Sequence, residues 1–219
     1  CEDSVDNRTV VMKFIYKRCD LILIQSRGFQ QSIIQLGVNE NKIKYFPNWA
    51  ESFFKPLDKK LPETQRIDLP GGDSFKIMFA GNIGAAQCFD IILEAAIKLK
   101  SKKISWIILG DGRRKKWLDE QIEIHSLQSN IFTLGKKPVD DMPFYYSLAD
   151  VMLVSLEPHP VFSAWIPGKV QSYMACGKPI LALLSGAGAE AIKESRSGFA
   201  IESGKADELI SKVEELSLM

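Results

Sequence analysis

The sequence predicts an α/β protein with a parallel sheet that is covered by helices on both faces. Six apolar runs of strand length recur along the chain: Lys76–Ala80, Ser105–Leu109, Ile131–Leu134, Val151–Leu156, Ile180–Leu184 and Phe199–Ile201. Segments with helical periodicity lie between them, such as the one in which Phe89, Ile92, Leu93, Ala96 and Leu99 share one helix face. Strands that read as unbroken apolar runs and alternate with helices are typical of a parallel sheet buried on both sides.

The first 50 residues are expected to form the end of a separate, amino-terminal domain. Residues 1–18 have helical periodicity, and their apolar side chains gather on one face: Val10, Val11, Phe14 and Ile15. We expect this helix to pack on its own domain, with a helix lying on a membrane surface as the alternative. The elements that follow are a strand over Asp20–Gln25, a helix over Arg27–Leu36 and a strand over Lys42–Phe46.

Residues 51–73 read as a linker between domains. Prolines and glycines are concentrated there among mixed charges: Pro56, Pro62, Pro70, Gly71 and Gly72. Residues 74–219 are then the domain that contains the predicted sheet. Because the chain begins with Cys1, in the middle of a helical pattern, we expect it to be a fragment of a longer protein.

The composition excludes several classes of partner. A formal net charge of +1, with no basic stripe interleaved with aromatic residues, argues against nucleic acid. Four scattered cysteines and two histidines argue against a zinc site and a disulfide framework, so we predict no metal. No apolar run approaches the roughly 20 residues that span a bilayer, and no signal peptide is recognised. We therefore expect a cytoplasmic protein, and peripheral association with the inner face of the cytoplasmic membrane stays open.

Candidate binding residues lie in the loops that follow the strands, because ligands of open parallel sheets bind at the carboxyl ends of the strands. The first loop contains Gly81, Asn82, Gly84 and Gln87, whose spacing differs from the dinucleotide fingerprint. The second contains Gly110, Asp111 and Gly112. Asp111 could accept a hydrogen bond from a ligand hydroxyl or cap the helix that follows.

Two later loops offer further candidates. Val161 and Phe162 follow the fourth strand and provide apolar contact area, whereas the neighbouring His159 is expected to have no chemical role. Glu190 follows the fifth strand, where it could stabilise a helix start or approach a ligand.

The stretch from Ile166 to Ile180 reads as a loop, a short helix and a buried strand in succession. Pro167 is suited to open the helix, and Gly177 to end it in a left-handed conformation. Lys169 then lies beside the helix N-terminus, where aligned N–H groups and an ammonium could bind an anion such as phosphate. The alternative is an ordinary surface lysine.

Four motifs in this order carry a resemblance to a known family: Phe-Ala-Gly-Asn-Ile-Gly, Leu-Gly-Asp-Gly-Arg, Ala-Asp-Val-Met-Leu-Val-Ser and Pro-Gly-Lys-Val-Gln-Ser-Tyr-Met-Ala-Cys-Gly-Lys-Pro-Ile. Over residues 74–216 the chain resembles the Rossmann-like carboxy-terminal domain of a GT-B, family 4 glycosyltransferase. Within that family it is most similar to bacterial O-antigen and capsule enzymes of the L-fucosamine transferase type. Residues 1–50 resemble the end of the family's amino-terminal, acceptor-binding domain.

The resemblance implies a hexosyltransferase-type enzyme of lipopolysaccharide or capsule biosynthesis that works without a cofactor. It would move a sugar from a UDP-sugar donor, such as UDP-L-FucNAc, to a glycan or lipid-linked acceptor. The alternatives are a sugar-nucleotide epimerase on the same fold and a non-catalytic, nucleotide-binding partner subunit. This chain alone is expected to bind the donor without transferring the sugar.

The resemblance also implies which residues contact the substrate, although it assigns no catalytic residue. The candidates are Gly81, Asn82, Gly84, Gln87, Gly110, Asp111, Gly112, Val161, Phe162, Lys169, Ser172 and Glu190. Asn82 and Gln87 stand where the family often has Arg and Lys for the diphosphate, and Lys169 could compensate for the missing charges. Ala164 and Ser172 stand where the family has a pair of glutamates.

Overall fold

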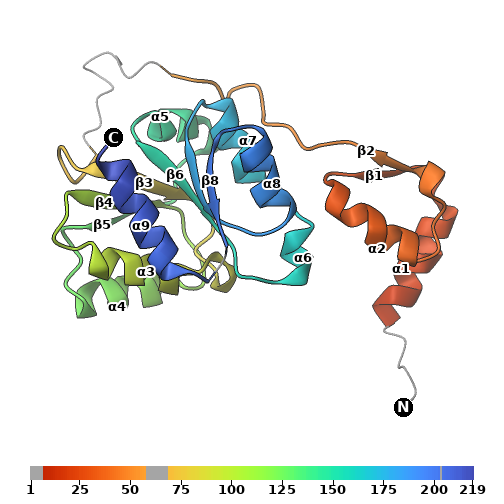
Figure 1. Cartoon of the computed structure of the whole chain (residues 1–219), viewed down its shortest axis with the longest axis horizontal. Helices are drawn as coiled ribbons and strands as arrows, with labels where there is room; N and C mark the ends of the chain where they lie inside the picture. The colour runs from red at the N-terminus through yellow and green to blue at the C-terminus, as the bar shows by residue number, and fades with distance from the viewer. Residues whose placement is uncertain (1–6, 58–68, 203) are drawn as a thin grey trace.

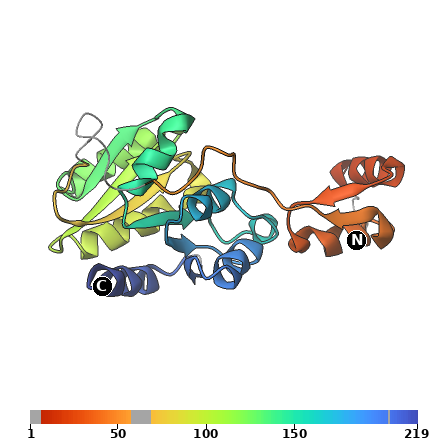
Figure 2. The same cartoon turned by 90° about the horizontal axis from the view of Figure 1, so that it is seen from above.

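The computed structural model describes residues 7–57, 69–202 and 204–219, which form two units joined by an extended segment (Figure 1, Figure 2). The smaller unit contains two parallel strands, β1 (Ile22–Ile24) and β2 (Ile43–Tyr45). Its helices are α1 (Asn7–Arg18), η1 (Arg27–Phe29), α2 (Gln30–Gln35) and η2 (Glu40–Lys42). Its core consists of five buried aliphatic side chains: Ile22, Ile24, Ile33, Val38 and Ile43.

The larger unit contains a six-stranded sheet in which every pair of neighbours is parallel, in the order β5-β4-β3-β6-β7-β8. Its strands are β3 (Phe75–Ala80), β4 (Ile104–Leu109), β5 (Ile131–Gly135), β6 (Val151–Ser155), β7 (Ile180–Leu183) and β8 (Gly198–Ile201). Each corresponds to one of the six predicted apolar runs. The predicted parallel sheet is therefore confirmed.

The helices of the larger unit cover both faces of this sheet (Figure 1). They are η4 (Ala85–Gln87), α3 (Phe89–Lys98), α4 (Lys115–Ile124), η5 (Val139–Asp141), α5 (Met142–Ser147), α6 (Pro160–Ser163), α7 (Gly168–Ala175), α8 (Ala187–Glu194) and α9 (Ala206–Ser217). One buried cluster combines the sheet with α3, α4 and α9, and the other combines it with α5, α7 and α8.

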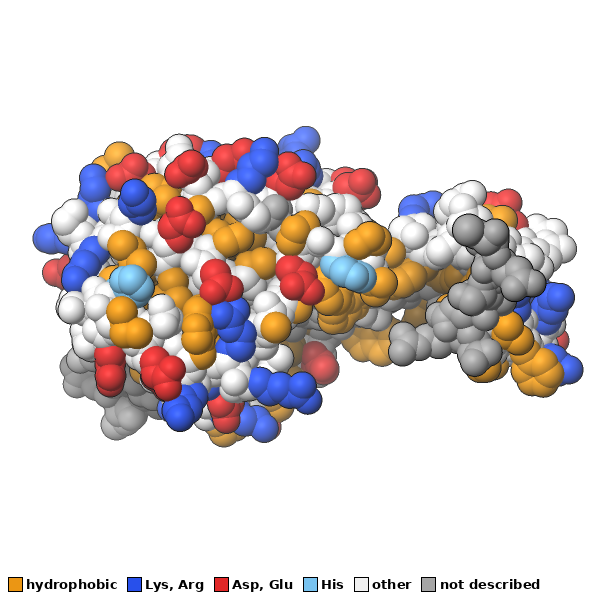
Figure 3. Space-filling model, turned by 90° about the horizontal axis from the view of Figure 1, so that it is seen from below, with side chains coloured by type: hydrophobic (Ala, Val, Ile, Leu, Met, Phe, Trp, Pro, Cys, Tyr) orange, Lys and Arg blue, Asp and Glu red, His pale blue; other side chains and the backbone are white. Residues whose placement is uncertain are grey.

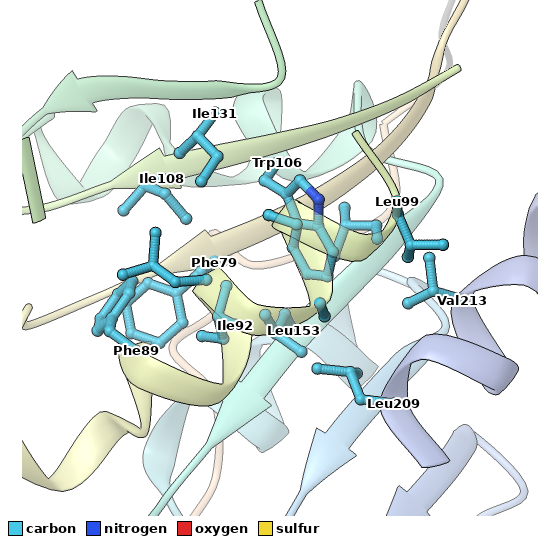
Figure 4. Close-up of a cluster of buried hydrophobic side chains, with 14 of the residues drawn as sticks. Phe79, Phe89, Ile92, Leu99, Trp106, Ile108, Ile131, Leu153, Leu209 and Val213 are labelled. Carbon is cyan, nitrogen blue, oxygen red and sulfur yellow. The ribbon is translucent and has the colours of Figure 1, made fainter. Parts of the chain in front are cut away.

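Successive residues of a strand point to opposite faces, so each central strand contributes to both clusters. In β3, Phe79 belongs to the α3 side, whereas Met78 and Ala80 belong to the α7 side. The ring of Phe79 meets the ring of Phe89 from α3 edge-on at 5.0 Å between centroids, and both are fully buried (Figure 4). Burial of such a side chain stabilises the fold by roughly 1.5–3 kcal/mol.

Part of the predicted linker is built into the core of the larger unit. Phe54 is buried, and its ring stacks at 6.0 Å on the ring of Tyr146 from α5. Leu69 is buried in the same cluster. The predicted linker therefore includes anchoring residues at both ends, while residues 58–68 lie outside the described part of the chain.

The apolar face of α1 is exposed in this chain. Val10, Val11, Phe14 and Ile15 are each at least half exposed, because the described part of the smaller unit packs only the other side of the helix through Tyr16. The expected packing of the apolar face of α1 within the smaller unit is therefore not seen among the described residues.

Among the described residues, no helix is both long and apolar enough to cross a membrane. The described cysteines, Cys19, Cys88 and Cys176, are free thiols.

Candidate functional site

The strand order has a topological switch point between β3 and β6, because β4 and β5 follow on one side of β3 whereas β6 lies on its other side. The pairing of β3 with β6 ends at Phe79 and Leu153, one residue before β3 itself ends. Beyond that point the Tyr173 hydroxyl of α7 replaces β6 as the hydrogen-bonding partner of β3. It accepts from Ala80 N–H at 3.1 Å and donates to Ala80 C=O at 3.2 Å. Ligands of such sheets bind at this point.

Lys169 lies one helical turn before Tyr173 on the same face of α7. The Lys169 ammonium is 3.9 Å from the centroid of the Phe79 ring. It also lies against the first loop glycine, because a Cβ built on Gly81 would be 2.7 Å from Lys169 Nζ. The predicted placement of this lysine beside a helix start is therefore seen, with Pro167 as the N-cap.

Among the described residues, Lys169 has no acidic counter-ion. Its side chain is partly buried, and no described acidic group contributes to its electrostatics. Burial alone lowers the pKa of its ammonium to about 8. An anion bound beside Gly81 would stabilise the charged ammonium and so offset the cost of its burial.

The loops after β3 and β4 are joined backbone to backbone. Gly81 N–H donates to Leu109 C=O at 2.9 Å, and Ile83 N–H donates to Asp111 C=O at 2.8 Å. A Cβ on Gly110 would lie only 1.8 Å from the Gly81 carbonyl oxygen. Glycine at position 110 is thus required by close approach as well as by its φ of +135°.

These loops border a cleft of about 490 Å³ at the carboxyl ends of β3, β4 and β5. Five of the predicted site residues line it: Gly81, Asn82, Gly110, Asp111 and Gly112. The sequence interpretation missed its other wall, which consists of Lys136, Lys137, Val139, Met142 and Tyr146. The signal was available, because this wall begins with the loop that follows the third predicted strand. Ligand pockets typically have this size, with apolar walls and a few polar groups.

Several predicted residues make local contacts that shape the cleft. The Asp111 carboxylate accepts from Gly112 N–H at 2.7 Å, and the Gln87 amide oxygen accepts from Gly84 N–H at 3.2 Å. The exposed Asn82 side chain covers two glycines, since a Cβ on Gly84 or Gly112 would lie 2.6 Å from its amide group. Asp111 and Asn82 remain open to a ligand in the cleft.

The remaining candidates lie away from this cleft. Val161 and Phe162 are on α6, where His159 acts as a structural cap because its Nδ1 accepts from Val161 N–H at 3.2 Å. The Ser172 hydroxyl donates to Gly168 C=O within α7 at 3.3 Å. Glu190 lines a separate cavity of about 130 Å³ between the two units.

Within the described ranges, no group of three or more His, Cys, Asp or Glu side chains has a metal-binding arrangement. The site therefore offers the Lys169 ammonium, exposed backbone and polar side chains. Such groups can bind and orient an anionic ligand and stabilise negative charge on it.

The sequence profile of one protein family, described as Glycosyl transferases group 1, matches residues 74–218. The chain is 28% identical over 190 residues to "Probable glycosyltransferase WbjE" of Pseudomonas aeruginosa, covering 84% of this chain and 46% of that protein. It is 27% identical over 155 residues to WcaI of Escherichia coli (strain K12), a protein named for colanic acid biosynthesis, covering 69% of this chain and 37% of that protein. The chain thus spans less than half the length of these curated relatives.

Solved structures share the fold. The structure of Anabaena Alr3699/HepE in complex with UDP-glucose matches with a TM-score of 0.78 at 19% identity, covering 94% of this chain and 56% of that chain. Sucrose-phosphate synthase from Thermosynechococcus elongatus matches with a TM-score of 0.76 at 16% identity, covering 95% and 52%. The predicted GT-B type of fold is confirmed by these likenesses.

Proposed function

This chain belongs to the glycosyl transferases group 1 family, and from that premise we propose that it binds a UDP-sugar donor. The whole protein would transfer the sugar to a glycan or lipid-linked acceptor during synthesis of a bacterial surface polysaccharide. The observation that carries the proposal is the partly buried Lys169 ammonium against Gly81, next to a cleft of nucleotide size. The structurally similar HepE is described in complexes with UDP and with UDP-glucose, which supports this donor class.

Each part of the donor has a matching surface in this proposal. The nucleoside occupies the cleft between Gly110 and Val139, where apolar walls exclude water from the base. The diphosphate lies beside Gly81, where Lys169 and the exposed backbone compensate its charge. Asn82 and Asp111 are in reach of ligand hydroxyls at the cleft border. Catalysis would then come from holding the donor and stabilising the departing diphosphate, without a metal.

Calorimetric titration of UDP and uridine tests the diphosphate assignment. Lys169→Ala should weaken UDP binding by about ten- to a hundredfold, because a charge-assisted hydrogen bond contributes roughly 1.5–3 kcal/mol. Uridine binding should stay within twofold of wild type, since uridine has no phosphate. The UDP affinity should also be the same in EDTA.

The matched control is Lys116→Ala, which removes a lysine whose side chain is 91% exposed on α4. It should leave both affinities unchanged. Equal losses for UDP and uridine in Lys169→Ala would show that the lysine shapes the loop instead of binding phosphate. Absence of UDP binding by wild type would refute the proposed function.

The finer assignment to a UDP-N-acetylamino sugar such as UDP-L-FucNAc rests on the sequence motifs. It is tested with the whole protein and a panel of UDP-sugars, by detecting UDP release in the presence of lipid-linked acceptors. Release that depends on both donor and acceptor supports the transferase. Conversion of the donor without acceptor would favour the epimerase alternative, and binding without turnover by the whole protein would favour a partner subunit.

A further inference from the structure

The segment that joins the two units is anchored on the wall of the nucleotide cleft. Phe54, which belongs to this segment, is 8% exposed, and its ring stacks on the Tyr146 ring at 6.0 Å between centroids and 5° between planes. Tyr146 is itself 4% exposed and lines the cleft of about 490 Å³. Through one ring, the connecting segment therefore contacts a side chain that borders the cleft.

The backbone around Phe54 is held on both sides of the ring. Phe54 N–H donates to Glu51 C=O at 3.0 Å, which closes a turn before the buried ring. Pro56 lies against the turn that follows α7, since a Cβ built on Gly177 would be 3.4 Å from Pro56 Cγ. Figure 3 shows hydrophobic side chains exposed on the larger unit close to its junction with the smaller one, whereas Phe54 is almost completely covered. The Phe54 ring therefore has little freedom to turn.

A second ring contact leads from Tyr146 to the end of β3. The Tyr146 ring meets the Tyr173 ring edge-on, at 4.9 Å between centroids and 88° between planes. The Tyr173 hydroxyl in turn bonds to the backbone of Ala80, the last residue of β3, which also lines the cleft. Because buried rings pack closely, removal of the Phe54 ring would leave space into which the Tyr146 ring can turn.

We propose that Phe54 is a positioning residue for the nucleotide, because it holds the Tyr146 ring in the orientation that forms the cleft wall. Phe54 acts through Tyr146 and is not among the residues that line the cleft. The inference rests on the proposed function, which assigns this cleft to the nucleoside of the UDP-sugar. The nucleotide site then extends into the segment between the two units.

The positioning contact is tested without ligand, by carbon-13 NMR of the full chain labelled at the Cζ atom of its five tyrosines. Tyr146→Phe identifies the Tyr146 signal, which should be one sharp line in wild type. Phe54→Leu keeps the position apolar but removes the flat ring. The Tyr146 signal should then broaden or split, because the ring samples more than one orientation. Phe54→Tyr keeps a flat ring and should restore the single line, next to the signal of the added tyrosine.

The consequence for the ligand is tested by calorimetry with uridine and UDP. Phe54→Leu should weaken both affinities by the same factor, about three- to tenfold, because the wall contacts the nucleoside that the two ligands share. This pattern differs from that of Lys169→Ala, which should affect UDP alone. Phe54→Tyr should keep both affinities within twofold of wild type.

Two controls separate positioning from a general loss of stability and from other contact between the units. Leu209→Val removes one methylene from the buried cluster on the opposite face of the sheet, so it lowers stability away from the cleft. Ser26→Ala removes a buried hydroxyl of the smaller unit that donates to Ala164 C=O in the larger one. Both variants should keep the uridine and UDP affinities within twofold and leave the Tyr146 signal sharp.

Three results would overturn the proposal: a sharp, single Tyr146 signal in Phe54→Leu, a loss of affinity confined to UDP, or an equal loss in Leu209→Val. If wild type binds neither uridine nor UDP, the proposed function fails instead. The NMR comparison of Phe54→Leu with wild type still decides in that case whether Phe54 sets the Tyr146 ring.

Discussion

Lys169 has two possible charge states near neutral pH, which makes it a direct probe of the site. Its ammonium has a pKa of about 8 because burial disfavours the charge. A diphosphate bound next to it would favour the charged form and raise that pKa. Binding of UDP must therefore weaken as the pH rises through the pKa of the free protein.

We expect the UDP affinity of wild type to fall between about pH 7 and pH 9, below the pH at which uracil itself ionises, and to approach that of Lys169→Ala. The variant should show no such fall, and neither should uridine with wild type. Titrations at several pH values, in buffers of different ionisation enthalpy, would also detect proton uptake on binding near pH 8. A UDP affinity that stays constant over this range would mean that Lys169 does not face the phosphates.

Tyr173 is the second residue with a specific prediction. Tyr173→Phe leaves the buried Ala80 N–H and C=O without the partner that replaces β6. Each buried group left unsatisfied costs about 1–3 kcal/mol, so the unfolding free energy should fall by at least that amount. Urea denaturation measures it, with the exposed Tyr45→Phe as a control expected to stay within about 0.5 kcal/mol. Equal stabilities would contradict the bridging role.

Individual site residues were only partly predictable from sequence. The spacing after Pro167 was enough to place Lys169 at a helix start, because proline and glycine punctuate structure locally. The hydroxyl of Tyr173 could not be assigned to Ala80, since that contact depends on where β6 leaves β3. The same limit applies to Ser26, whose partner Ala164 is distant in sequence and belongs to another unit.

At the scale of elements, the backbones of the loops after β3 and β4 are in direct contact, and glycine at position 110 allows this close approach. Gly110→Ala would place a methyl group on the Gly81 carbonyl, in addition to the strain of a positive φ. We expect a loss of about 2–5 kcal/mol in unfolding free energy and at least a tenfold weaker UDP affinity.

Gly135→Ala is the matched control for this substitution. Gly135 also has a positive φ, of +69°, but a Cβ there would meet nothing within 4 Å. It should cost only the backbone strain of about 1–2 kcal/mol and leave UDP binding intact. If urea denaturation shows the same loss of unfolding free energy for both variants, the close approach of the two loops contributes nothing to the stability of the fold.

The strands themselves were predictable because continuous apolar runs bounded by turn residues are typical of strands buried on both faces. The wall at Lys136, Lys137 and Val139 was not predicted, although its strand was. Its approach to Gly110 follows from the strand order, in which β5 lies next to β4. A single sequence gives the presence of strands more reliably than their neighbours.

For the whole molecule, the division into domains at residues 51–73 remains a prediction, and the structure suggests where to test it. Phe54 and Leu69 are buried against the larger unit. A chain of residues 48–219 should therefore be more stable than one of residues 74–219 by about 3–6 kcal/mol, the amount expected for burying two large apolar side chains.

Urea denaturation of the two shortened chains measures this difference, and UDP titration shows whether both keep the nucleotide cleft. Phe54→Ala in the longer chain is the specific control, because it removes the ring that stacks on Tyr146. It should lose roughly 3–5 kcal/mol. Equal stability of the two shortened chains would show that the segment before β3 adds nothing to the core.

The loops of the larger unit differ in how freely their sequences can diverge. Changing Gly110 requires a simultaneous change in the opposite loop, because the Gly81 backbone occupies the space of a side chain at position 110, whereas a side chain at position 81 would displace the Lys169 ammonium. Val161 has no such constraint, since most of its side chain is in solvent and its backbone is held by His159. Proteins descended from a common ancestor with this fold could therefore change position 161 through single substitutions, while the two glycines stayed the same. We expect the glycines to persist and position 161 to vary when orthologues are sequenced.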